Sequence, residues 1–337
     1  MIVWHVVPEF VLANEHQGAF KDVLSRTRWL EVRAESYRRF AVAGDDPACA
    51  TGWPAEPAPT HILVEYTRLP RLSAWLRELH PRAKLLVRAH NIEPLQHLDN
   101  MGWRPSRGTL WLMYGMWRLF RQDLACMRHA DVLLSINEWE NGVYWKRLPG
   151  RARVEWLPYV CPDSLVPGRP EPYDQRTTIA CLPTSQKNRK SWDLVVRFCA
   201  LARQMKRLGC TDEFVVTGRL GDWGLPPCPE VVFAGFVPDL PALLGKCRAV
   251  ALLSPLGYGF KTTLADAWAA GAHVLAHPDL IRRLPAQVAR ELIGVDTGRP
   301  ATVAAAADKL RIPSRGAELH SDLRACFDGT MRAWFNP

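Results

Sequence analysis

A glycine-punctuated loop with one lysine carries the strongest chemical signal in this sequence. The loop covers 254–261 and contains Gly257, Gly259 and Lys261. The two glycines let the backbone approach a ligand closely and adopt positive φ angles. The N–H groups at the start of the helix expected next favour an anion, and Lys261 adds a positive charge. This spacing predicts a loop that binds phosphate groups.

An acid, Asp266, follows the loop in what the sequence predicts to be the first turn of that helix. A carboxylate accepts hydrogen bonds from a diol such as ribose. The loop and the acid together predict a site for a nucleoside diphosphate. The alternative is an ordinary turn whose lysine is solvated, and the loop alone does not decide between the two.

Basic residues also stand at the start of a second predicted helix. Lys190 is the residue we expect to contact phosphate there, because a helix N-terminus favours anions. Lys187 and Arg189 are its rivals. The structural alternative is a solvated basic turn.

Polar residues follow a predicted buried strand in the first half of the chain. His90 comes directly after the strand at 84–89. Histidine suits contact with a reacting hydroxyl, because its ring gains and loses a proton near neutral pH. The alternative is a histidine that only caps the strand end. Glu93 could hold a hydroxyl of a substrate or cap the next helix.

Composition limits the class of protein. With 337 residues, of which 48% are apolar and 23% charged, the chain should fold into two globular domains. No apolar run approaches the roughly 20 residues that span a bilayer. The N-terminus lacks the features of a signal peptide, so we expect a cytoplasmic protein. Nine cysteines without Cys-x-x-Cys spacing indicate reduced thiols and no zinc site.

The net charge of +9 suits an anionic partner. We expect no nucleic acid, because no zinc-finger, RNA-recognition or basic-zipper pattern accompanies the arginines. The predicted helix at 109–128 has apolar residues on more than one stripe, together with Arg118, Arg121 and Arg128. Its outer part could lie on an anionic membrane, as a peripheral contact at the inner face. The alternative, which we favour here, is burial between other helices or in a dimer.

Strand and helix signals alternate along the whole chain. This alternation predicts an α/β fold with doubly wound parallel sheets that are covered on both faces. The expected strands are 2–7, 61–66, 84–89, 131–136, 154–157, 178–182, 213–217, 231–234 and 249–254, and the main expected helices are those from 19, 69–79, 109–128, 191–208, 302–310 and 318–335.

The segment 159–177 has the composition of a linker, with four prolines and Gly168. We therefore predict a first domain at 1–165 and a second at 166–317, with the helix in 318–337 packing back on the first. Two such domains in series place a cleft between the carboxyl ends of two sheets, where ligands of open α/β folds bind.

Several motifs, in this order, resemble those of retaining GT-B glycosyltransferases, particularly family 4. The likeness covers nearly the whole chain and is strongest over 88–158 and 233–276. The motifs that carry it are RAHNIE at 88–93, DVLLSIN at 131–137, WLPY at 156–159, VVFAGFVPDL at 231–240 and GYGFK at 257–261 with Asp266 and AAG at 269–271.

The resemblance implies two Rossmann-like domains and transfer of a sugar from a nucleoside diphosphate sugar to a hydroxyl of a glycan or lipid-linked glycan. It implies retention of configuration, no cofactor and no obligatory metal. His90, Lys261 and Asp266 would be catalytic, and His90, Asn91 and Glu93 would face the acceptor. The implied donor-binding residues are Gly18, Lys190, Phe236, Val237, Gly257, Tyr258, Gly259, Phe260, Lys261, Thr262, Thr263 and Asp266.

The chain also departs from the family pattern. Many members have two carboxylates eight positions apart in the donor loop. Here the later one is Asp266, shorter than the usual glutamate, and the earlier position is Leu256 or Gly257. The loop is two residues longer than the common form, and Thr263 stands where that variant usually has a basic residue. A sugar epimerase, a phosphorylase or a non-catalytic nucleotide-sugar-binding module is the alternative.

Overall fold

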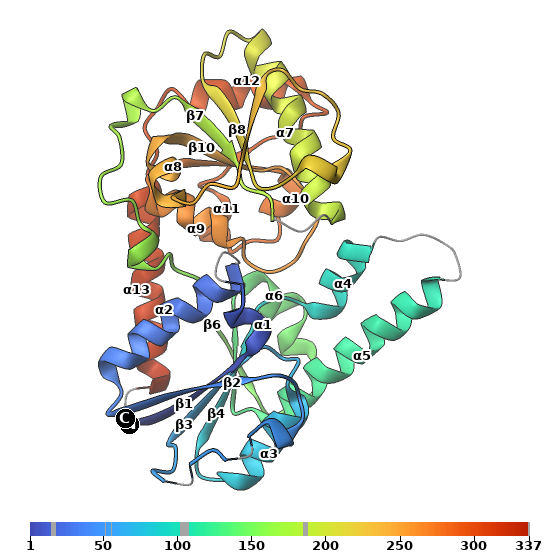
Figure 1. The fold of residues 1–337 in the computed structure, drawn as a ribbon, viewed down its shortest axis with the longest axis vertical. Helices are drawn as coiled ribbons and strands as arrows, with labels where there is room; N and C mark the ends of the chain where they lie inside the picture. Colours follow the sequence, from blue (N-terminus) through green and yellow to red (C-terminus); the bar gives the residue numbers. More distant parts are fainter. Residues whose placement is uncertain (15–17, 51, 55, 102–107, 185–187, 336–337) are drawn as a thin grey trace.

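The computed structural model describes residues 1–14, 18–50, 52–54, 56–101, 108–184 and 188–335. In this part of the chain, two six-stranded parallel sheets lie one above the other with helices around them (Figure 1). Their strand orders are β2-β1-β3-β4-β5-β6 and β12-β11-β10-β7-β8-β9. The predicted α/β class with doubly wound sheets is confirmed.

The four central strands of the first sheet are short apolar runs that are buried on both faces, as parallel sheets require. The sequence did not predict its edge strand β2, which contains Arg38 and Arg39 and pairs with β1 from Ser36 opposite Ile2. The strands are β1 (Ile2–Pro8), β2 (Ser36–Val42), β3 (His61–Glu65), β4 (Lys84–Ala89), β5 (Val132–Ser135) and β6 (Arg153–Trp156).

The helices of the first half flank this sheet. The predicted helix at 109–128 is confirmed as the long helix α5, whereas α4 was not predicted as a helix. The elements are α1 (Glu9–Leu12), α2 (Gly18–Arg33), α3 (Pro70–Leu79), α4 (Glu93–Met101), α5 (Gly108–His129) and α6 (Glu138–Val143). None of the described helices is long and apolar enough to cross a membrane.

The second half repeats the alternation. The segment 159–177 contains only short 3-10 turns before the second sheet begins. The strands are β7 (Thr178–Cys181), β8 (Glu213–Thr217), β9 (Val231–Gly235), β10 (Cys247–Leu252), β11 (His273–Ala276) and β12 (Ile293–Gly294). The helices are α7 (Arg189–Arg207), α8 (Leu240–Lys246), α9 (Thr262–Ala269), α10 (Pro278–Ile281), α11 (Ala286–Ala289), α12 (Pro300–Lys309) and α13 (Gly316–Phe335).

The last helix, α13, runs beside both sheets (Figure 1). The indole N–H of Trp29 in α2 donates to Asp328 over 3.0 Å, and Phe335 packs against the rings of Trp29 and His61. A single apolar cluster continues from Leu63 of the first sheet through Phe327 of α13 to α9. The two halves therefore share part of their core.

Candidate functional site

The loop between β10 and α9 needs glycine at two positions. Gly257 and Gly259 have φ angles of +91° and +78°. A Cβ atom on Gly257 would lie 2.7 Å from Cδ of Lys190 and 2.8 Å from Nζ of Lys261. On Gly259 it would clash with the side-chain amide of Asn91. The structure thus brings both predicted lysines, and one predicted acceptor residue, against this loop.

Two helix N-termini meet beside the loop. Helix α2 begins at Gly18 and α9 begins at Thr262. A Cβ atom on Gly18 would lie only 2.4 Å from Oγ1 of Thr262, so glycine permits this approach. The N-cap residue of α9, Lys261, makes no side-chain capping bond. Because the first N–H groups of a helix lack intrahelical partners, the meeting of two such ends creates a positive potential.

The cations of the site are crowded and withdrawn from water. Nζ of Lys261 donates to the carbonyl of Tyr258 over 3.0 Å. Burial lowers the pKa of Lys261 well below its usual value, and nearby Lys190 and Arg283 lower it further. Burial also lowers the pKa of Lys190. The guanidinium of Arg283 lies 4.9 Å from the centre of the Tyr258 ring. A bound anion would stabilise the charged form of these groups.

Side chains of the first domain hold the loop through its backbone. Three successive loop amides donate to oxygens of α4 and α6: Gly257 to Asp99 (2.6 Å), Tyr258 to Gln96 (2.9 Å) and Gly259 to Glu140 (2.6 Å). The sequence predicted none of these acceptors. Because these amides are engaged in this closed arrangement, the start of α9 and the two lysines remain as the main groups for phosphate.

Glu140 is a functional candidate that sequence reasoning missed. Its side chain is 1% exposed. Burial raises its pKa to about 7, although the Gly259 amide and Lys261 oppose the rise. Its second oxygen, Oε2, has no hydrogen-bond partner among the described residues. The sequence did offer one signal for Glu140. It follows β5 at the same edge of the sheet as His90 follows β4, and ligands of such sheets bind at this edge.

Asp266 lies elsewhere than predicted. Helix α9 begins at Thr262, so Asp266 is in the second turn and the expectation of a first-turn acid is wrong. Its carboxylate is 2% exposed and accepts from Nζ of Lys21 (2.7 Å) and from the hydroxyl of Tyr159 (2.7 Å). Lys21 belongs to α2, so this is a buried ion pair across the two domains. Contact with ribose stays a prediction that requires these bonds to rearrange.

The ring of His90 lies in a buried network and not on an open surface. It is 6% exposed, with Nε2 3.1 Å from Glu65 and Nδ1 3.4 Å from Asp22. It stacks on Tyr66 with ring centres 4.1 Å apart. Its backbone carbonyl faces the loop, because a Cβ atom on Gly259 would lie 2.5 Å from it. A catalytic role for the ring stays a prediction.

The other predicted acceptor residues have protein partners. In the amide orientation that satisfies its surroundings, Asn91 donates to the carbonyls of His90 (2.9 Å) and Tyr258 (3.1 Å). Glu93 is 2% exposed and forms an ion pair with Arg68. Both residues therefore sit at the domain boundary with their side chains already held.

The remaining predicted donor residues differ in exposure. Phe260 is buried in the shared core, whereas Phe236 is 49% exposed, with the guanidinium of Arg219 6.0 Å from its ring. Val237 and Thr263 are half-buried. Of the two rivals of Lys190, Arg189 is exposed at the start of α7, and Lys187 lies outside the described residues.

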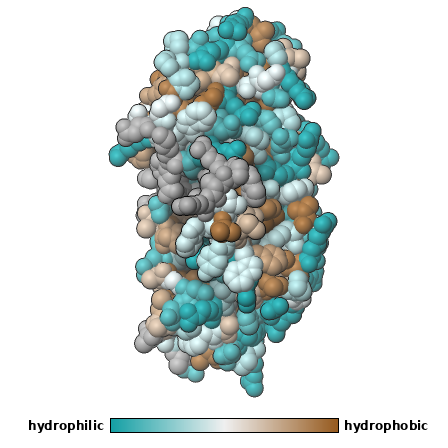
Figure 2. Space-filling view, turned by 90° about the vertical axis from the view of Figure 1, so that its right-hand side faces the viewer, coloured by the Kyte–Doolittle hydropathy of each residue, from teal (hydrophilic) through white to brown (hydrophobic). Residues whose placement is uncertain are grey.

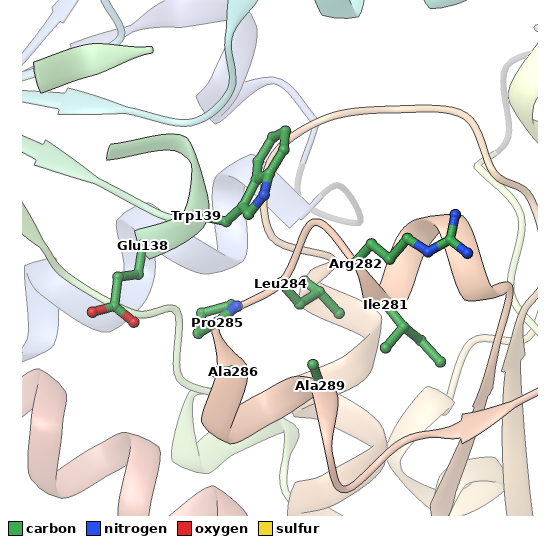
Figure 3. A pocket seen from close by; sticks show the side chains of 8 residues that line it. All are labelled: Glu138, Trp139, Ile281, Arg282, Leu284, Pro285, Ala286 and Ala289. Carbon is green, nitrogen blue, oxygen red and sulfur yellow. The ribbon is translucent and has the colours of Figure 1, made fainter. Parts of the chain in front are cut away.

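A surface hollow of about 430 Å³ opens beside this site between α6 and α10–α11 (Figure 3). Trp139 extends over it, and the charged ends of Glu138 and Arg282 point to opposite sides. None of the predicted donor residues lines it. The lining residues are Glu138, Trp139, Ile281, Arg282, Leu284, Pro285, Ala286 and Ala289.

No family model and no curated protein matches this chain. Solved structures do match it over nearly the full length. Sucrose-phosphate synthase from Thermosynechococcus elongatus aligns with a TM-score of 0.63 at 12% identity, covering 97% of this chain and 95% of that one. HepE from Anabaena in complex with UDP-glucose aligns with a TM-score of 0.59 at 14% identity, covering 99% and 100%.

A glycosyltransferase from Rickettsia africae also aligns, with a TM-score of 0.57 at 12% identity, covering 97% of this chain and 93% of that chain. The fold of the chain is therefore that of GT-B glycosyltransferases, as the sequence motifs indicated. At these identities the likeness establishes the fold alone.

Proposed function

We propose that the protein transfers a sugar from a nucleoside diphosphate sugar to a hydroxyl group of an acceptor. One observation carries the proposal: the N-termini of α2 and α9 meet where Lys261 and Lys190 converge on a glycine loop. Backbone N–H groups, helix dipoles and two lysines together form a site for a diphosphate. HepE, which has the same fold, was crystallised with UDP-glucose and with UDP and glucose.

The diphosphate is the leaving group, and its negative charge grows as the bond to the sugar breaks. Lys261 is half-buried beside the loop and partly desolvated, so its interaction with that charge is stronger than it would be in water. Binding of the diphosphate favours the protonated form of Lys261 and of Lys190. With both lysines charged and two helix N-termini present, the transfer needs no divalent metal.

The acceptor hydroxyl approaches from the first domain. The segment at His90 and Asn91 packs against Gly259, so it lies next to the loop together with α4 and α6. We propose a glycan or lipid-linked glycan as acceptor, in polysaccharide biosynthesis, with retention of the donor's configuration. The donor sugar is a hexose or deoxyhexose.

The first experiment identifies the donor. Thermal shifts are measured with UDP-, GDP- and dTDP-linked sugars, because a ligand that binds only the folded state raises its apparent stability. Calorimetry with the matching nucleoside diphosphate and nucleoside then compares wild type with Lys261→Ala. The diphosphate should lose about 1.5–3 kcal/mol of binding free energy and the nucleoside almost none.

Lys246→Ala is the matched control, because Lys246 is an exposed lysine at the end of α8. Equal losses for diphosphate and nucleoside in Lys261→Ala would refute the phosphate contact. Product analysis separates transfer from epimerisation or phosphorolysis. Tight donor binding with neither transfer nor hydrolysis would indicate a non-catalytic binding module.

A further inference from the structure

Helix α5 carries large apolar side chains on a face that no described part of the chain covers. Its other face is buried, as Leu112 and Leu119 show at 5% and 7% exposure. The burial between other helices that we favoured from the sequence therefore holds for one face of the helix only, and burial in a dimer stays a prediction. The exposed side chains, which we call the outer face of α5, are Leu110 (76%), Trp111 (77%), Met113 (56%), Tyr114 (54%), Trp117 (52%) and Phe120 (38%).

Arginines lie among these side chains, and no exposed acid accompanies them on the helix. Arg118 and Arg121 are exposed, and the guanidinium of Arg121 lies 5.0 Å from the centre of the Trp117 ring. The one acid of α5, Asp123, is 0% exposed and accepts from Thr67 and Tyr144. Burial raises the pKa of Asp123 well above its usual value. The outer face therefore combines apolar and aromatic side chains with positive charges, and it carries no exposed negative charge.

This combination of residues favours one kind of binding partner for the outer face of α5. Trp and Tyr side chains are typical of the boundary between lipid and water, and Arg side chains are attracted to the negative surface of an anionic membrane. A second copy of this chain would bring arginine against arginine if the two outer faces paired. We propose that the outer face of α5 lies on the surface of a membrane that contains anionic lipids.

The shape of the molecule agrees with such a contact. The N-terminal part of helix α5 projects from the side of the molecule, whereas its C-terminal part packs beside α3 and the first sheet (Figure 1). Seen from that side, brown and pale side chains gather below the grey atoms and form no deep groove (Figure 2). A helix that lies in the plane of the membrane needs an exposed apolar surface, and it does not need a groove. The surface is distinct from the donor site, so the inference does not depend on the proposed function.

Co-sedimentation with vesicles tests the proposal on the full chain. The probes are vesicles of phosphatidylcholine alone and of phosphatidylcholine with phosphatidylglycerol. Wild type should bind the anionic vesicles and release them as salt increases. Trp111→Ser with Trp117→Ser, and separately Arg118→Glu with Arg121→Glu, should each weaken binding roughly 10-fold or more.

The matched control is Ile312→Ser with Arg311→Glu, which changes an exposed apolar residue and an exposed arginine after α12. It should leave vesicle binding unchanged. A thermal melt checks that each variant is folded. Absence of vesicle binding by wild type, or equal losses in the control variant, would overturn the proposal. So would a dimer that the Trp111/Trp117 variant dissociates without lipid, because a second copy would then cover this face.

Discussion

Two groups of charged side chains lie close together in this molecule. They differ in the balance of positive and negative charge within each group. In the first domain, Arg26 pairs with Glu65 over 2.7 Å and Arg88 pairs with Asp22 over 3.0 Å. Burial would raise the pKa values of Asp22 and Glu65, but the arginines hold both below their usual values. Here each buried acid has a buried cation, and the network is complete without a ligand.

The second group, at the donor loop, is not complete. Lys190, Lys261 and Arg283 lie together, and burial lowers the pKa values of both lysines. Two acids lie beside them: Asp99, which accepts from a loop amide, and Glu140, whose pKa is raised to about 7 by burial. The three basic side chains thus outnumber the two acids there. A self-neutralised cluster stabilises a domain, whereas a cluster with excess charge of one sign is suited to a ligand of the opposite sign.

Glu65→Ala breaks the first group and should have the largest effect. It leaves buried Arg26 with Asp22 but without its second carboxylate partner, so the free energy of unfolding should fall by about 3–5 kcal/mol. Urea unfolding measures the loss. Glu35→Ala is the control, because the Glu35 side chain is 80% exposed and pairs only with the chain's amino group. Similar losses in the two variants would show that the network contributes no more than a surface pair.

His90→Ala tests whether the first group also serves the reaction. If the ring meets the reacting sugar, turnover should fall about 10²-fold while affinity for the free nucleotide stays close to wild type. His5→Ala is the matched control, because His5 also contacts Glu65 (2.7 Å) but belongs to β1. A loss of turnover that is equal in both variants, and that follows their melting temperatures, would assign His90 a structural role only.

Gly259→Ala tests the contact between the two groups. The left-handed φ and the close approach to Asn91 and His90 should together cost about 1–3 kcal/mol of unfolding free energy. Gly209→Ala is the control, with a φ of +80° and nothing within 4 Å of the added Cβ. The difference in urea midpoints isolates the contact with the first domain. Equal urea midpoints for the two variants would mean that the contact of Gly259 with His90 and Asn91 contributes nothing to the free energy of unfolding.

Glu140→Gln sharpens the comparison through pH and should have the smallest effect. In wild type the folded pKa of about 7 exceeds the unfolded value. The folded state therefore binds more protons between the two values, and stability falls as pH rises through this window. Glutamine does not ionise, so the variant lacks this pH dependence. Between about pH 6 and about pH 8, the free energy of unfolding should therefore fall by roughly 1 kcal/mol more in wild type than in Glu140→Gln. Parallel melting curves across that range would contradict the buried ionisation.

The alternation of apolar runs was sufficient to predict the α/β class and most strands, because strands of parallel sheets are apolar on both faces. It missed β2, an edge strand in which Arg38 and Arg39 break the apolar pattern. It also missed α4, a helix of nine residues. The glycine loop and both lysines were predictable, because their chemistry is local.

Glu140, Asp99 and Gln96 could not be found in the same way. Each contacts the loop across more than a hundred positions in sequence, and only the packing of the two domains brings them together. For Asp266 the predicted position in the helix was wrong, because the residue lies in the second turn and not in the first. The helix begins at Thr262, and this start places the carboxylate beside Lys21 of α2.

Helix α4 touches two surfaces with different partners. Its Gln96 and Asp99 bind amides of the donor loop, and its His97 packs against Gly115 of α5. One short helix thus connects the face that we place on lipid with the site that we assign to a nucleotide. Binding at two connected sites is reciprocal: the factor by which vesicles change nucleotide affinity equals the factor by which nucleotide changes vesicle affinity. If vesicle binding and nucleotide binding are coupled through α4, the membrane acts as an effector of this protein as well as its support.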